Sequence, residues 1–211
     1  MKTRALLLAL PVLALAGCTR QNHASVAIQA ICYPTDTCTF SSTCTNSVIG
    51  TPIVDVSANG GTTEFFLQVA NQLPDNSDKD AGRVNTNGAH VDQVSVSYDQ
   101  VGLPTDSYYT SNMVIPADGT NVIAVWATRA WVGNNATILQ DAVAAGGGVA
   151  ELVAKIRLRG YYDDGSTFET GEFKMGVNVC DGCLNLPFCP PGKSACPFEG
   201  MEPVGCGTTG G

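Results

Sequence analysis

Apolar and polar side chains alternate along several short segments of the chain, which is the pattern of half-buried β-strands. In residues 64–69, Phe65, Leu67 and Val69 alternate with Glu, Phe and Gln. Residues 94–98 repeat the pattern, with two valines and a tyrosine separated by serines. Both segments are therefore predicted to be strands with one face toward a core.

The segments between and after these strands complete the pattern. Residues 74–88 are polar and predict a loop, whereas 113–115 and 121–129 predict two further strands joined by a turn at 116–119. Residues 137–145 predict one short helix that ends at three consecutive glycines, and the alternative is that these glycines mark a loop.

A β-hairpin is predicted from Val149 to Val179, with its turn at Asp163-Asp164-Gly165-Ser166. Asp-Gly favours the two-residue turn whose twist suits antiparallel strands. A turn centred on Asp164 and Gly165 places Ile156 opposite Phe173, and the apolar positions of both strands then share one face. The same register pairs Ala154 with Met175, Leu152 with Val177, Arg157 with Glu172, and Tyr161 with Phe168.

Short strands separated by turns, with very little helix, indicate an all-β protein. We expect an antiparallel immunoglobulin-like or fibronectin-like β-sandwich of about seven strands, with Cys-rich irregular ends stapled by disulfides. The composition agrees, because charged residues make up only 14% of the chain while Gly, Thr, Ser, Asn and Val are abundant.

The N-terminus has a different pattern. Lys2 and Arg4 precede an apolar run from Ala5 to Ala16, and small residues follow the run. This order of charged, apolar and small residues is that of a secretory signal peptide. The run is too short to span a bilayer, and no later stretch is apolar enough to do so.

Residues 15–18, Leu-Ala-Gly-Cys, resemble the lipobox of bacterial lipoproteins. The resemblance implies cleavage before Cys18, diacylglycerol on its sulfur and acylation of its amine. Thr19 stands where an Asp would retain such a protein at the inner membrane. The resemblance therefore implies a lipid-anchored protein of the Gram-negative outer membrane, facing the periplasm or the cell surface. The alternative is an ordinary secretory signal in which Cys18 is one more cysteine.

Composition along the chain divides it into five parts. Residues 1–17 are the expected signal peptide and 18–31 a lipidated tether. Residues 32–52 are a Cys- and Thr-rich stapled segment, 53–180 the β-sandwich domain, and 181–211 a Cys-, Pro- and Gly-rich tail packed on that domain.

Part of the predicted sandwich has a family resemblance. Residues 66–74, Phe-Leu-Gln-Val-Ala-Asn-Gln-Leu-Pro, followed by 94–98, resemble the opening of the water-stress, late-embryogenesis-abundant group 2 sandwich. In that family an Asn-containing strand precedes a strand that ends in Tyr. The resemblance favours an immunoglobulin-like sandwich and implies no functional residue.

The charge balance limits the partners. Without Lys2 and Arg4, nine basic residues face 19 acidic ones, which gives a net charge of −10. An acidic body argues against nucleic acid and against electrostatic attraction to anionic lipid. Lipid on Cys18 is thus the expected link to the membrane, an envelope protein or a glycan is the expected partner, and no cofactor is expected.

Eight cysteines besides Cys18 would lie in an oxidising compartment, where cysteines normally pair as disulfides. They form a first group of three and a second group of five: Cys32, Cys38 and Cys44, then Cys180, Cys183, Cys189, Cys196 and Cys206. Because both counts are odd, complete pairing requires at least one bridge between the groups. Such a bridge closes a loop of well over 100 residues and would contribute about 4–5 kcal/mol.

The second cysteine group has two alternative interpretations. Cys180 and Cys183 have the spacing of a zinc knuckle, which Cys189 and Cys196 could complete. A redox-active Cys-x-x-Cys is the other alternative. The oxidising compartment and the position of the motif at a strand end favour structural disulfides.

The polar loop carries a weak calcium candidate in Asn76, Asp78 and Asp80, whose oxygens alternate along the chain. Gly82 comes one position too late for an EF-hand, and Asn87 stands where a bidentate Glu is needed. These departures favour a solvated loop.

Signals for catalysis are weak. The chain has no Gly-x-Ser-x-Gly and no Ser-x-x-Lys, and its two histidines are His23 and His90. A set of aromatic side chains could form a binding face, although most of them are expected in the core or in cross-strand pairs: Tyr108, Tyr109, Trp126, Trp131, Tyr161 and Tyr162. We therefore expect a non-catalytic binding, adhesion or structural module, with no catalytic residue. The alternatives are an envelope hydrolase or accessory subunit of an envelope enzyme complex, and a calcium-dependent binding module.

Overall fold

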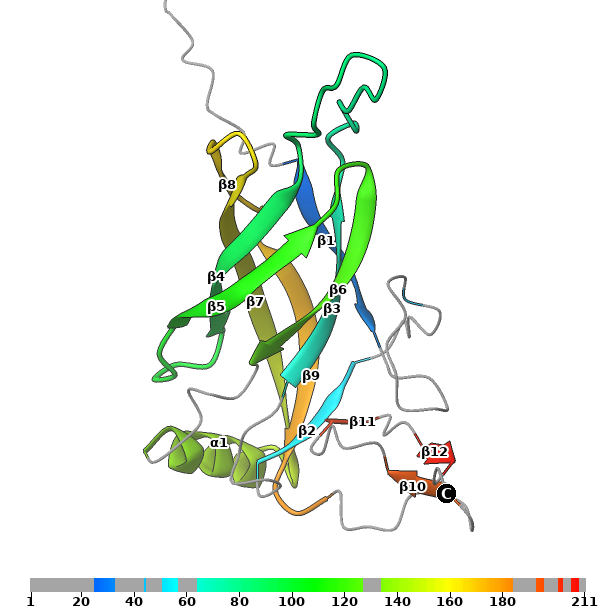
Figure 1. The fold of residues 1–211 in the computed structure, drawn as a ribbon. Coiled ribbons are helices and arrows are strands. Elements are labelled where there is room, and N and C mark those ends of the chain that lie inside the picture. Colours follow the sequence, from blue (N-terminus) through cyan, green and yellow to red (C-terminus); the bar gives the residue numbers. More distant parts are fainter. Residues whose placement is uncertain are drawn as a thin grey trace, which may run out of the picture.

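The structure is a computed structural model that describes residues 25–32, 44, 51–56, 64–126 and 134–183, and the backbone of three short strands nearer the C-terminus. These residues form a mostly-β body with two main sheets and one short helix (Figure 1). The prediction of a β-rich, two-sheet fold is confirmed at this level.

The smaller main sheet is antiparallel and contains β1 (Val26–Cys32), β3 (Glu64–Asn71) and β6 (Gly119–Trp126), in that order. The larger sheet curls into a half barrel (Figure 1). Its order is β11 (Met201–Glu202), β2 (Ile53–Asp55), β9 (Phe173–Cys180), β7 (Val149–Tyr162), β4 (Ala89–Tyr98) and β5 (Asp106–Ile115), and β8 (Thr167–Glu169) also pairs with β7. A separate pair is formed by β10 (Lys193–Ala195) and β12 (Cys206–Thr208).

The core lies between the two sheets, because alternate residues of their strands point inward. Along β7 every even-numbered residue is buried. The predicted apolar face of β3, which is Phe65, Leu67 and Val69, is fully buried in the same cluster. The helix α1 (Asn134–Ala145) lies at the lower end of the body in Figure 1, and its Leu139 and Val143 belong to the core cluster.

The predicted hairpin is confirmed over most of its length. β7 and β9 pair from Val149–Cys180 to Ile156–Phe173 in the expected register. The predicted pair of Tyr161 with Phe168 is wrong, because Phe168 lies opposite Gly160. The turn holds one more residue than predicted: Gly165 has φ 82°, and the Tyr162 N–H donates to the Ser166 carbonyl at 2.8 Å. An extra residue before Phe173 then restores the predicted register.

Two other expectations need correction. The larger sheet is mixed rather than antiparallel, because β2 runs parallel to β9 with Asp55 opposite Cys180. Residues 26–31, expected to be tether, belong to the folded body as part of β1, which pairs with β3 along its length. The folded body therefore begins before the expected boundary at residue 53.

The helix and the loops lie closer to the positions expected from the sequence. The helix α1 starts at Asn134 rather than at 137 and ends before the glycines; Gly147 and Gly148 have φ 75° and 110°. The predicted turn at 116–119 joins β5 to β6, and residues 72–88 form the expected loop between β3 and β4. Within the described part of the chain, no helix is long and apolar enough to cross a membrane.

Candidate functional site

The solvent-facing side of the large sheet carries rows of polar residues that cross several strands. One row runs from Tyr109 on β5 through Gln93 on β4 and Arg159 on β7 to Glu169 on β8. The next contains Ser107, Ser95 and Arg157 on the first three of these strands. We call these seven residues the polar face.

Ion pairs fix the positions of the charged side chains on the polar face. The Arg159 Nε donates to a Glu169 carboxylate oxygen at 3.0 Å, and Arg157 donates to Glu172 at 3.0 Å. Lys174 lies 3.4 Å from the other oxygen of Glu172. Partial removal from water raises the pKa of Glu172, but the hydrogen bonds and charges of Lys174 and Arg157 outweigh it and hold that pKa below its ordinary value. The predicted Arg157–Glu172 contact is thus confirmed.

The polar face is hollowed by a shallow depression of about 90 Å³, lined by Gln93, Ser95, Ser107, Arg157, Arg159 and Glu169. Tyr109 stands in the same cross-strand row and is 81% exposed, whereas its neighbour Tyr108 is buried. The result is a row of hydrogen-bonding groups with one exposed aromatic ring.

A second hollow of about 400 Å³ lies farther along the same side of β7 and β9. Gly176 helps to open it, because a Cβ at this residue would come within 3.4 Å of Thr51. Its polar lining is Thr51, Asp99, Glu151 and Asn178. One carboxylate oxygen of Asp99 accepts a hydrogen bond from the Val153 N–H at 2.7 Å, which anchors that side chain.

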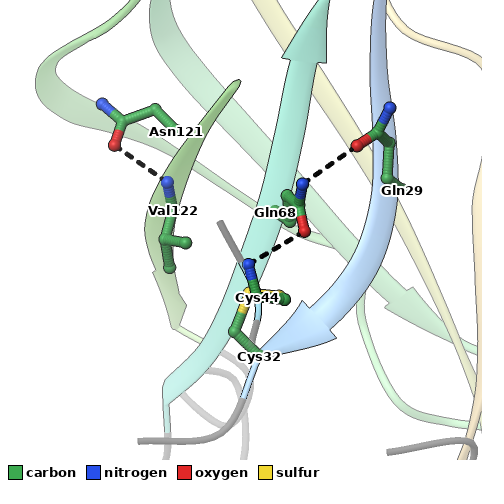
Figure 2. Close-up of a disulfide and its surroundings, with 6 residues drawn as sticks. All are labelled: Gln29, Cys32, Cys44, Gln68, Asn121 and Val122. Atoms are coloured by element: carbon green, nitrogen blue, oxygen red, sulfur yellow. Dashed lines mark hydrogen bonds between the residues drawn. A yellow bond between two sulfur atoms is a disulfide. The ribbon is translucent and has the colours of Figure 1, made fainter. Parts of the chain in front are cut away.

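Four of the predicted disulfide cysteines form two bridges. Cys32 pairs with Cys44, with 5.2 Å between their Cα atoms, and Cys180 pairs with Cys183, with 5.8 Å. In Figure 2, Gln68 lies beside the first bridge and accepts a hydrogen bond from the Cys44 N–H at 3.1 Å. Each bridge lies within its own cysteine group.

The other sulfur positions are not covered: Cys18, Cys38, Cys189 and Cys196 lie outside the described residues, as does the side chain of Cys206. Outside the two described bridges, one cysteine of the first group and three of the second remain, so both counts are still odd. If all eight pair, the bridge between the groups must use Cys38.

Among the described residues, the cluster with metal-ligand geometry is Asp55, Cys180 and Cys183, whose ligand atoms lie within 4.8 Å of one another. The two sulfurs are joined as a disulfide, so Cys180 and Cys183 offer no thiolate for the alternative interpretation as a zinc knuckle. The sequence alone did not indicate that Asp55 lies near these two cysteines, because that proximity depends on the parallel pairing of β2 with β9.

Two of the three calcium candidates, Asn76 and Asp78, form hydrogen bonds within the loop. The Asn76 side chain exchanges two hydrogen bonds with Thr86, and one Asp78 oxygen accepts from the N–H groups of Asp80 and Ala81. These bonds shape the turns of an exposed loop. They leave fewer oxygens of Asn76 and Asp78 for a cation.

His90 contacts a carboxylate and an aromatic ring. Its Nε2 lies 2.6 Å from an Asp163 oxygen, and its ring stacks on Tyr161 at 4.8 Å between centroids. The other predicted aromatics are divided: Tyr162 is buried, Trp126 is 41% exposed, and Trp131 lies outside the described residues. The predicted aromatic face is therefore reduced to Tyr109, with Trp126 and Tyr161 partly accessible.

No family model matches this chain, and no similar sequence is found among curated proteins.

Proposed function

We propose that the protein is a lipid-anchored envelope lipoprotein, attached through Cys18 to the outer membrane, whose sheet surface is a non-catalytic binding module for a neutral glycan. The observation that carries the glycan proposal is the polar face, with its depression and the exposed ring of Tyr109. A sugar presents hydroxyls in a plane and apolar C–H faces, so it matches hydrogen-bonding rows beside an aromatic ring.

The charge pattern favours a neutral ligand. The arginines of the polar face are already paired with Glu169 and Glu172, so they offer little net attraction for an anion. The nearby hollow carries the carboxylates of Asp99 and Glu151, which repel one. In the described residues the exposed apolar side chains are scattered: Val84, Val101, Tyr109, Val114, Trp126 and Val149. This scatter supports a sugar over a large apolar protein partner.

The scaffold supports this role. Two facing sheets support the proposal of an immunoglobulin-like or fibronectin-like sandwich, although the parallel β2–β9 pair departs from a purely antiparallel arrangement. Hydrogen-bonded strands hold the polar face rigid, so little conformational entropy is lost when a chain of sugars binds.

The test measures retention of the full chain on immobilised neutral and acidic polysaccharides. Tyr109→Ala removes the exposed ring and should weaken binding about fivefold, equivalent to about 1 kcal/mol. Val84→Ala is the matched control, because Val84 is 77% exposed in the loop of residues 72–88. Equal loss with both variants, or retention on the acidic polymers alone, would contradict the proposal.

A hydrolase is the second candidate, because Asp99 and Glu151 both line the larger hollow and paired carboxylates catalyse glycoside hydrolysis. The same polysaccharides distinguish the two functions. Release of new reducing ends by the wild type, abolished in Glu151→Gln, would establish hydrolysis, whereas binding without release supports the module.

The anchor has its own test. Cys18→Ser removes the sulfur that carries the lipid, so the protein should move from the detergent phase to the aqueous phase and lose incorporated fatty acid. An unchanged distribution would contradict the lipoprotein assignment.

A further inference from the structure

A buried carboxylate lies beside the Cys180–Cys183 disulfide, at the end of the large sheet. The parallel pairing of β2 with β9 places Asp55 opposite Cys180, and the Val56 N–H donates to the Cys180 carbonyl at 2.9 Å. The Asp55 side chain accepts a hydrogen bond from the Gly182 N–H at 2.8 Å, inside the loop that the disulfide closes. Asp55 is 3% exposed.

The two cysteines differ in accessibility. Cys180 is completely buried, whereas Cys183 is exposed. An Asp55 oxygen and both sulfurs lie within 4.8 Å of one another, a separation that one water molecule spans. A thiol from outside can therefore reach Cys183, while the sulfur of Cys180 stays next to the carboxylate.

A purely structural role explains these features poorly. The disulfide joins residues three positions apart, so it closes a small loop and restricts the unfolded chain less than a bridge such as Cys32–Cys44. Hydrogen bonds such as that from the Gly182 N–H offset the cost of burying the Asp55 carboxylate, and its position beside the disulfide also allows a chemical task. Moving the proton of a thiol is such a task, because the thiolate is the reactive form of cysteine.

We infer that Cys180 and Cys183 are a redox-active pair that exchanges its disulfide with an external dithiol. A substrate thiolate attacks the Cys183 sulfur, a mixed disulfide forms and the S–S bond to Cys180 breaks. The second substrate thiolate then attacks the substrate sulfur of the mixed disulfide and releases Cys183. The substrate is oxidised to a disulfide, and the protein pair is reduced to two thiols that take up the two substrate protons. Asp55 relays one of these two substrate protons to the Cys180 thiolate as the bridge opens. In the reverse reaction an external disulfide is the oxidant, and Asp55 passes the proton of Cys180 to the departing external thiolate as the bridge forms.

The first test places the full chain, purified in detergent, in a series of reduced to oxidised glutathione ratios, followed by alkylation and peptide mass spectrometry. The Cys32–Cys44 bridge is the internal reference. The Cys180–Cys183 bridge should be half reduced at a ratio at least about tenfold less reducing, while circular dichroism shows a folded protein. If both bridges open together, or if this bridge opens only on unfolding, the inference is wrong.

The second test identifies the attacked sulfur. Cys180→Ser should capture one glutathione on Cys183, and Cys183→Ser should capture glutathione on buried Cys180 at least about tenfold more slowly. Equal capture rates would overturn the assigned roles. Because both variants lack the same bridge, a difference between them does not come from the loss of that bridge.

The third test concerns the carboxylate. Asp55→Asn should slow glutathione exchange at least about tenfold, whereas Asp181→Asn, the same change at an exposed residue next to Cys180, should leave the rate unchanged. The melting temperature of each oxidised variant reports whether the fold is intact. Equal rates in a folded Asp55→Asn protein would exclude the proton-transfer role; if that variant unfolds, capture by the two cysteine variants decides the proposal. Stoichiometric zinc binding by the reduced protein without disulfide exchange would overturn the redox inference in favour of a metal site.

Discussion

Gly160 tests the packing of the large sheet with the smallest change available, one methyl group. It is buried in β7, opposite Val91 of β4 and Phe168 of β8. A Cβ at this position would overlap the carbonyl oxygen of His90 and lie 2.9 Å from the Phe168 ring. Because the oxygen belongs to the backbone of β4, the overlap is relieved only if the two strands separate.

The expected magnitude follows from those contacts. Overpacking of a buried position costs about 1–3 kcal/mol, and a weakened hydrogen bond between the strands adds about 1 kcal/mol. Gly160→Ala should therefore lower the free energy of unfolding by about 3 kcal/mol, and the melting temperature by about 6–12 °C for a chain of this size.

Gly171→Ala is the matched control, because it lies in the same hairpin and its added Cβ meets no atom within 4 Å. Its effect should stay within about 1 kcal/mol, in the stabilising direction if the unfolded chain loses freedom. Urea unfolding followed by circular dichroism, with disulfides intact, measures both variants. An unchanged midpoint for Gly160→Ala would refute the predicted close approach of β7 to β4.

Three further predictions use other contacts. Asn71→Ala should cost about 2–3 kcal/mol, because buried Asn71 donates to the Asn87 carbonyl at 2.6 Å and accepts from the Leu73 N–H at 3.1 Å. Urea unfolding checks this, and a loss no larger than for Asn121→Ala, at a half-buried position of β6, would contradict it. Replacing both Cys32 and Cys44 by Ala should lower the free energy of unfolding by about 3 kcal/mol, because it removes a disulfide that joins residues 12 positions apart. Thermal unfolding without reductant measures this, and an unchanged melting temperature would count against the bridge. Glu172→Gln should lower the melting temperature at neutral pH. The difference in melting temperature from the wild type should shrink as the pH falls through the lowered pKa of Glu172, because a carboxyl with a lowered pKa stabilises the fold above the ordinary pKa of 4.5 and loses this contribution below its folded pKa. A difference that persists at pH 2 would contradict the ion pair.

Local alternation predicted much of the fold, and the hairpin shows why. Two strands that follow one another around an Asp-Gly turn have few ways to pair, and burial of one face selects the register from Val149 to Ile156. The error at the tip arose because Gly165 extends the turn by one residue in a left-handed conformation, which the same sequence permits equally well.

Pairings between distant segments carried no comparable signal. The sequence of β1 alternates poorly, and only its pairing with β3 identifies it as a strand. The Asp55 carboxylate reaches Cys180 through a parallel pair of strands more than 100 residues apart in sequence. The polar face also joins strands β5, β4, β7 and β8, so its parts are visible in sequence only after the sheet order is known.

The parallel position of β2 also has a consequence for the order of folding. β2 pairs with β9 and β11, which are both synthesised long after it, so β2 has no partner in the large sheet while the chain emerges. The β7–β9 hairpin closes locally and forms early, whereas addition of β2 requires closure of a long loop and comes late. Asp55 therefore reaches Cys180 in one of the final steps, and until then the two cysteines react without the carboxylate beside them.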